Sequence, residues 1–420
     1  MKGRNDVMTG KKDLILRRVL EFYVDSAEFN GIPHWQLHAE VGGEMQDVNS
    51  MLEELLIERK ISLNFATNPH IRQFEDETPH AQLQALQNWQ TKKICIYPSQ
   101  TILSELPIDD YNNQPFTRMI RMGKPQLVPA FFDMAVLEPY YRDPEFLVQT
   151  SDFQGAILRT VPRRGEDETF LLSSFGLGYR QEGERVLTVY LRLLAQMPSK
   201  HQQYWFNHLL SGECKATPEY YQVTIAREKP EYHSIFEAFI EELYHINQMS
   251  LLMFGKKLFI RDFRDQRPDG FTTIFRPTHE AYCQFVQVLD QMMAANLNEE
   301  FFVDFKGPFS LSSDGNGGVD QVVGVMAGFS KWLKSGIRSH HMDDFELIYE
   351  PFKKIHSWQR QSAEEICTLE YGNEIFSWQN ELTFECYNAV KMIRLLFANH
   401  PMIKDYEIPD WLLLGKVTIY

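Results

Sequence analysis

Three residues in the middle of the chain combine the side chains that a magnesium-dependent nuclease needs. Asp269 and Asp304 offer carboxylates that could hold the metal, and Lys306 could assist the attacking water. A helical pattern from Thr278 to Leu297 separates them, where adjacent strands would normally be expected. The other interpretation is a surface loop, residues 261–269, whose side chains pair with one another: Arg261, Arg264 and Arg267 with Asp262, Asp265 and Asp269.

Histidine pairs offer a second kind of chemistry, metal binding. His34 and His38 lie one helical turn apart, but Trp35 stands where a zinc protease has its general-base Glu. His340 and His341 lie near Asp343 and Asp344, and together they could bind a metal ion. The alternative is that these residues form the polar start of a helix. We therefore predict no metal site.

Loops that bind nucleotides or calcium are missing from the sequence. The glycine-rich "DGNGG" at 314–318 lacks the regular oxygen ligands of a calcium loop. Neither a Gly-x4-Gly-Lys phosphate loop nor a Gly-x-Ser-x-Gly nucleophile elbow is present. We expect no cofactor.

The stretch from Gly31 to Phe65 predicts helix, turn, helix and strand, the order with which many DNA-binding domains begin. Its second helix carries carboxylates at Asp47, Glu53, Glu54 and Glu58, which would lie against phosphates. This acidic face favours protein contact over DNA recognition. Contact with nucleic acid could instead use the basic residues of the N-terminal arm and first helix, chiefly Lys11, Lys12, Arg17 and Arg18.

The composition of the chain predicts a folded protein that repels polyanions. Of its 420 residues, 44% are hydrophobic and 13% aromatic, and the formal net charge is -15. The five cysteines are scattered singly, as expected for reduced thiols in the cytosol. No segment has the roughly 20 apolar residues of a membrane helix. We expect a cytoplasmic protein without membrane contact.

Hydrophobic periodicity and turn residues predict a helix-rich α+β fold. Residues 1–75 fit a winged-helix domain of three helices and a hairpin, with strands at 61–65 and 71–75. Residues 76–93 are polar, with a short helical pattern, and are predicted to be a connector. Residues 94–340 mix strands, such as the hairpin 169–179 and 185–194, with helices at 199–210, 234–254 and 278–297.

The last predicted domain, residues 341–420, is a helical bundle. Apolar residues recur at steps of three and four along one long helix: Ile375, Trp378, Leu382, Cys386, Ala389, Ile393 and Leu396. Pro401 closes this helix. Such a stripe needs a partner helix, and residues 343–366 are the nearest candidate.

The order of parts, ending in "AVKMIRLLFANHP", resembles a group of bacterial proteins, and residues 343–401 resemble the HEPN superfamily. That superfamily contains helical bundles of toxin pairs and phage-defence effectors, many of them metal-independent ribonucleases. Its active members use an Arg and a His four to six residues apart, and two such pairs meet across a dimer. The resemblance implies Arg394 and His400 as the catalytic pair.

The expected position of the HEPN motif departs from the pattern, because Arg360 is followed by Glu364 and Glu365 and by no His. Arg227 and His233 also satisfy the spacing, but they lie outside the predicted bundle. A structural role for the Arg or the His at a helix end is the alternative for either pair.

From these patterns we expect a bacterial binding or regulatory protein, part of a defence or mobile-element system. Its winged helix and helical bundle would make contacts with a protein partner or with a second copy. The first alternative is a nuclease effector, either HEPN-like or magnesium-dependent. The second is a DNA-binding regulator that uses the basic N-terminal arm.

Overall fold

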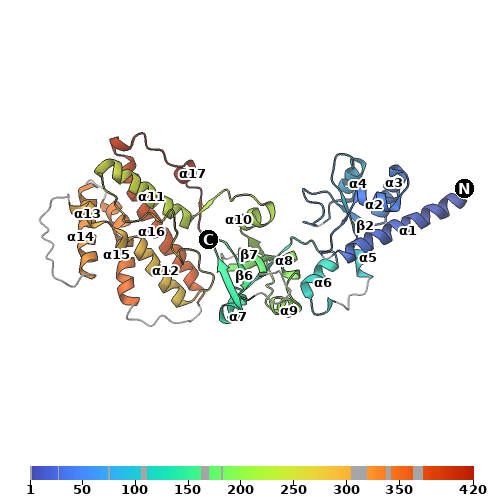
Figure 1. The fold of residues 1–420 in the computed structure, drawn as a ribbon, viewed down its shortest axis with the longest axis horizontal. Helices are drawn as coiled ribbons and strands as arrows, with labels where there is room; N and C mark the ends of the chain where they lie inside the picture. Colours follow the sequence, from blue (N-terminus) through green and yellow to red (C-terminus); the bar gives the residue numbers. More distant parts are fainter. Residues whose placement is uncertain are drawn as a thin grey trace. The chain divides into compact units, whose positions relative to one another are not determined.

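The structure, a computed structural model, describes residues 2–26, 28–73, 76–105, 111–161, 170–180, 183–303, 319–336, 342–362 and 372–420. The fold is mixed α and β and rich in helix, as the sequence predicts (Figure 1). The chain divides into two compact units. The first comprises residues 1–149 and 155–216, and the second comprises residues 150–154 and 217–420.

The first unit begins with helices around a small sheet. Its elements are α1 (Lys2–Asp25), β1 (Ile32–Pro33), α2 (His34–Val41), α3 (Met45–Ile57), β2 (Ile61–Asn64), α4 (Pro79–Gln87) and β3 (Cys95–Pro98). Both β1 and β2 pair antiparallel with β3, so β3 is the central strand. Gly42 and Gly43 end α2 with positive φ angles of 69° and 101°, which confirms the glycine turn predicted there.

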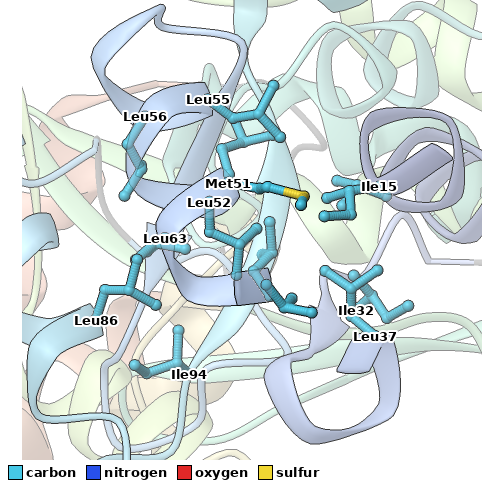
Figure 2. Close-up of a cluster of buried hydrophobic side chains, with 14 residues drawn as sticks. Ile15, Ile32, Leu37, Met51, Leu52, Leu55, Leu56, Leu63, Leu86 and Ile94 are labelled. Atoms are coloured by element: carbon cyan, nitrogen blue, oxygen red, sulfur yellow. The ribbon is translucent and has the colours of Figure 1, made fainter. Parts of the chain in front are cut away.

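One hydrophobic core holds these elements together (Figure 2). Ile15 and Val19 of α1 pack with Leu52 and Leu55 of α3 and with Ile96 of β3. All five side chains are almost completely removed from water. Burial of this kind stabilises the fold by about 25 cal/mol for each Å² of apolar surface.

One prediction about this region is wrong. Residues 71–75, of which 74 and 75 lie outside the described residues, were expected to pair with 61–65, but β2 pairs with β3, in the register Ile61↔Pro98 to Asn64↔Cys95. The short helical pattern of the expected connector, 76–93, corresponds to α4, whose Leu86 is buried in the core. The sheet therefore extends beyond residue 75. A four-residue apolar strand is too short to reveal from its own sequence which partner it takes.

The rest of the first unit is built on a second, larger sheet. Its strands are β4 (Pro129–Phe132), β5 (Phe146–Thr150), β6 (Gln154–Arg159), β7 (Phe170–Arg180), β8 (Arg185–Tyr190) and β9 (Cys214–Ala216). The order is β4-β8-β7-β6-β5, and β9 also pairs with β7. The antiparallel pairing of β7 with β8 confirms the predicted hairpin.

The first unit also contains short helices: α5 (Gln100–Ser104), α6 (Pro115–Arg121), η2 (Met134–Leu137), α7 (Glu138–Arg142), α8 (Leu191–Ala195) and α9 (Ser199–Asn207). The fully buried Trp205 of α9 packs edge-on against Phe132 of β4, with ring centroids 4.8 Å apart. The second half of the apolar run 185–194, predicted to be part of a strand, forms α8 instead.

The second unit is mainly helical. Its long helices are α11 (Ile235–Phe254), α12 (His279–Met292), α14 (Val319–Gly336), α15 (Met342–Ser362) and α16 (Glu374–Ala398). The short elements are α10 (Pro218–Tyr221), η3 (Gln222–Ala226), β10 (His233–Ser234), η4 (Ala294–Asn296), α13 (Glu299–Val303), η5 (Pro401–Ile403), α17 (Asp410–Leu413) and β11 (Val417–Thr418). β10 and β11 pair in parallel.

α16 is the central helix of this unit. It packs against both α11 and α15, and α15 also packs against α12. Ile375, Leu382, Cys386, Ala389 and Ile393 of the predicted stripe are buried, which confirms both the stripe and the partner helix. The predicted boundary at residue 340 is not a boundary between the two units, because α11 and α12 precede it and pack with the C-terminal helices.

Two further predictions concern the state of the cysteines and helices that could cross a membrane. Cys95, Cys214 and Cys386 are free thiols, as predicted, but Cys283 is disulfide-bonded, which corrects the prediction of reduced cysteines throughout. None of the described helices has the length and apolarity needed to cross a membrane.

Candidate functional site

A groove between α15 and α16 is the strongest candidate for a binding surface in the second unit. Its volume is ≈ 890 Å³. Three large apolar side chains along it are unusually exposed: Leu347 on α15 (58%), and Phe384 (50%) and Leu395 (45%) on α16. Contiguous apolar surface rimmed by polar residues is typical of a protein-contact site.

A proline interrupts the hydrogen bonding of α15 beside this groove. Pro351 is buried, lines the groove and has no backbone N–H, so it cannot donate the usual helical hydrogen bond to the carbonyl of Leu347.

Charged side chains surround the apolar strip. Glu346, Glu350 and Glu385 are acidic, and Lys354 and Lys391 are basic, so the lining residues sum to -1. Lys354 Nζ lies 2.7 Å from Glu385 Oε2, and Glu350 lies 3.1 Å from Lys353. Both pairs are solvent-exposed and are weak enough to be exchanged for contacts with a partner.

This groove was not predicted from the sequence, because the apolar stripe of α16 indicates the buried face of the helix. Phe384 and Leu395 do not belong to the predicted stripe. Apolar residues outside the main stripe of an amphipathic helix are the signal that could have revealed a second apolar face.

The HEPN-type pair, Arg394 and His400, occupies two different environments. Arg394 is buried, and its Nε and Nη2 donate to the two carboxylate oxygens of Glu242 on α11, the second at 3.2 Å. Burial raises the pKa of Glu242, and the Arg394 guanidinium opposes that rise. His400 is exposed, and its Nδ1 accepts from the backbone N–H of Met402 at 3.3 Å.

The second Arg and His pair with the HEPN spacing makes contacts of its own. Arg227 is a left-handed residue (φ 56°) at the end of η3. His233 Nδ1 lies 3.1 Å from Glu237, and its ring stacks on Trp411 with centroids 3.9 Å apart. These contacts fit a role in fixing β10 at the start of α11.

Two of the four predicted nucleic-acid contacts are engaged by carboxylates. Lys12 Nζ donates to Glu54 at 2.9 Å and to Glu58, and these bonds raise the pKa of Lys12. Arg18 forms an ion pair with Glu40. Arg17 is exposed and Lys11 is half-buried. The charges of Lys12 and Arg18 are therefore neutralised by carboxylates of α2, of α3 and of Glu58 at the end of α3.

The magnesium-type set is described only in part. Asp269 lines a polar pocket formed mainly by residues 257–269, whereas Asp304 and Lys306 lie outside the described residues. The expected pairing of arginines with aspartates inside this loop is wrong for two residues. Arg264 Nε lies 3.0 Å from Glu241, and Arg267 pairs with the buried Asp152, with Nη1 at 3.0 Å.

The histidines considered as metal ligands have hydrogen-bonding partners. His34 Nε2 lies 2.7 Å from Asn49 Oδ1, and burial lowers the pKa of His34. His38 Nε2 lies 3.0 Å from the carbonyl of Gly43. The pair 340–341 lies outside the described residues. Within the described ranges, no group of three or more His, Cys, Asp or Glu side chains is placed to hold a metal ion.

Comparison of the chain with models of protein families, with curated proteins and with solved structures finds no match in any of the three. The function must therefore be argued from the site itself.

Proposed function

We propose that this chain is a binding protein and that the groove between α15 and α16 takes up an amphipathic helix of a partner protein. The supporting observation is the strip of exposed apolar side chains, Leu347, Phe384 and Leu395, on two packed helices. A helix that docks in a groove inserts apolar residues at intervals of three and four.

The charges favour a partner with basic flanking residues over a second copy of this chain. The groove lining sums to -1, and the whole chain carries -15. Two copies with that charge repel each other at long range, whereas a basic segment is attracted. Self-association is the competing outcome of the test below.

The same proposal extends to the N-terminal elements. Helices α1, α2 and α3 with strands β1, β2 and β3 come in the order of a winged helix, with α4 inserted between β2 and β3. We propose that this part also contacts protein. On α3, Asp47 and Glu54 are exposed and Glu53 is half-buried, and Lys12 is paired with that helix. A duplex would meet mostly carboxylates on this face.

Site-specific photo-crosslinking tests the docking proposal. A photoreactive phenylalanine analogue replaces Phe384 in the intact protein, which is then irradiated in an extract of its source cells. We expect cross-links to a protein through a segment with helical apolar periodicity and Lys or Arg at its ends. Leu395→Lys should abolish them, because it places an ammonium group in the apolar strip.

The control places the same analogue at Leu414, which is 72% exposed at the end of α17 and does not line the groove. A synthetic peptide of the cross-linked segment should bind the wild type and not the Leu395→Lys variant. Cross-links only to a second copy would replace the proposal by self-association. Equal cross-linking from positions 384 and 414 would show that no specific docking occurs.

A further inference from the structure

A small pocket opens between α12, α15 and α16, beside the groove. Its volume is ≈ 220 Å³, below the roughly 300 Å³ at which pockets for drug-sized ligands begin. The buried side chains of Val286, Ile355 and Leu382 are among its lining residues. The pocket is therefore largely apolar and has room for a compact group only.

Three aromatic rings form much of the rest of its lining: Tyr282 of α12, Trp358 of α15 and Trp378 of α16. The Tyr282 ring meets Trp358 at 89° with centroids 5.5 Å apart, and Trp378 at 56° with centroids 5.7 Å apart. Trp358 and Trp378 remain 37% and 36% exposed. Rings contributed by three helices and inclined to one another can surround a single small group.

The charges around the rings favour a cation. Among the described lining residues, Glu381 and Lys354 are the charged ones. Lys354 is neutralised by Glu385 at 2.7 Å, so the carboxylate of Glu381, one helical turn after Trp378, is left unbalanced. Burial raises the pKa of Tyr282 to about 12, and the negative charges of Glu381 and Glu385 add to this effect.

We propose that this aromatic pocket, formed by Tyr282, Trp358, Trp378 and Glu381, binds a methylated ammonium group. The faces of aromatic rings attract cations, and this attraction is strongest when the cation is easily desolvated. Methyl groups weaken the hydration of an ammonium and add apolar contacts with the rings. An unmethylated ammonium keeps its strong hydration, and an anion is repelled by Glu381.

Two sources can supply this group: a free quaternary amine, or an N-methylated lysine side chain of a peptide. Both present the same head group to the rings. The inference does not depend on the docking of a helix in the neighbouring groove, because the pocket has its own lining and is tested with small probes.

Titration calorimetry of the intact protein with tetramethylammonium and with choline tests the proposal. We expect both to bind, and 3,3-dimethylbutan-1-ol, the uncharged analogue of choline, to bind at least about tenfold more weakly. A peptide with trimethyl-lysine and the same peptide unmodified form the second arm. Tighter binding of the methylated peptide than of choline would identify a lysine side chain as the source, and the reverse would identify a free amine.

Variants connect the binding to the pocket. Trp378→Ala should weaken binding of the methylated cation about tenfold, and Glu381→Gln about threefold. Trp35→Ala in the first unit and Glu374→Gln, an exposed carboxylate at the start of α16, are the matched controls and should change nothing. The proposal fails if no methylated cation binds, if the uncharged analogue binds equally well, or if Trp378→Ala binds like the wild type.

Discussion

Arg394 has a structural role in the second unit, although its residue type and spacing also suggested a catalytic one. It was singled out as one of a catalytic pair, and its guanidinium forms a buried ion pair with Glu242 between α11 and α16. A buried ion pair adds little stability compared with apolar residues, but losing one partner leaves an isolated charge in the core. Activity loss in an Arg394 variant would therefore not identify a catalytic role.

We expect Arg394→Met to lower the free energy of unfolding by about 3–5 kcal/mol near neutral pH. This difference in the free energy of unfolding between the wild type and the variant should become smaller at low pH. Burial raises the pKa of Glu242 above its unfolded value, so protonation favours the folded state, and stability falls as pH rises through that range. Urea unfolding of the intact protein at several pH values measures both effects.

The double variant Glu242→Leu/Arg394→Met is the control and should recover most of the lost stability, because no charge remains buried. An unchanged urea midpoint in Arg394→Met would contradict the structural role. His400→Ala is the better variant for testing the ribonuclease alternative, since His400 is exposed and its loss leaves the core intact.

At the scale of elements, α4 illustrates the limits of local patterns. The segment 76–93 is polar overall, and only a few of its side chains are buried. Leu86 is 1% exposed within the core around α3 and β2, and Trp89 packs against the same cluster. Leu83, Leu86 and Trp89, spaced three residues apart, are enough to anchor this segment in a core that other elements provide.

Leu86→Ala should therefore destabilise the first unit by about 2–5 kcal/mol, because it removes buried methyl groups and leaves a cavity. Ile57→Ala is the matched control: Ile57 is 70% exposed at the end of α3, and its loss should cost less than about 0.5 kcal/mol. Thermal unfolding followed by circular dichroism compares the two. Equal effects would mean that α4 does not contribute to the core.

At the scale of the whole molecule, charge restricts the class of partner. The chain carries -15, and Lys12 and Arg18 of the most basic helix form ion pairs with Glu54, Glu58 and Glu40. Non-specific binding of nucleic acid depends on cations that are free to replace counterions. Lys12 and Arg18 are therefore not free to do so.

We expect the intact protein to pass through a heparin column without retention at about 50 mM salt. A variant with Glu40, Glu54 and Glu58 changed to Gln should be retained, because Lys12 and Arg18 are then released. Changing the exposed Glu77, Glu105 and Glu145 to Gln is the control for net charge. Strong retention of the wild type would favour the nucleic-acid alternative over protein contact.

The sequence by itself determined the helix-rich mixed fold, the Gly42–Gly43 turn, the β7–β8 hairpin and the packing of α16 on α15. Each depends on periodicity or on turn residues within a few tens of positions, which are local properties of the chain. Only the tertiary structure decided that β3 completes the first sheet, that Arg394 meets Glu242, and that Tyr282, Trp358 and Trp378 line one pocket. These contacts join distant residues, and their partners are selected by the packing of the whole core, which a single segment does not encode.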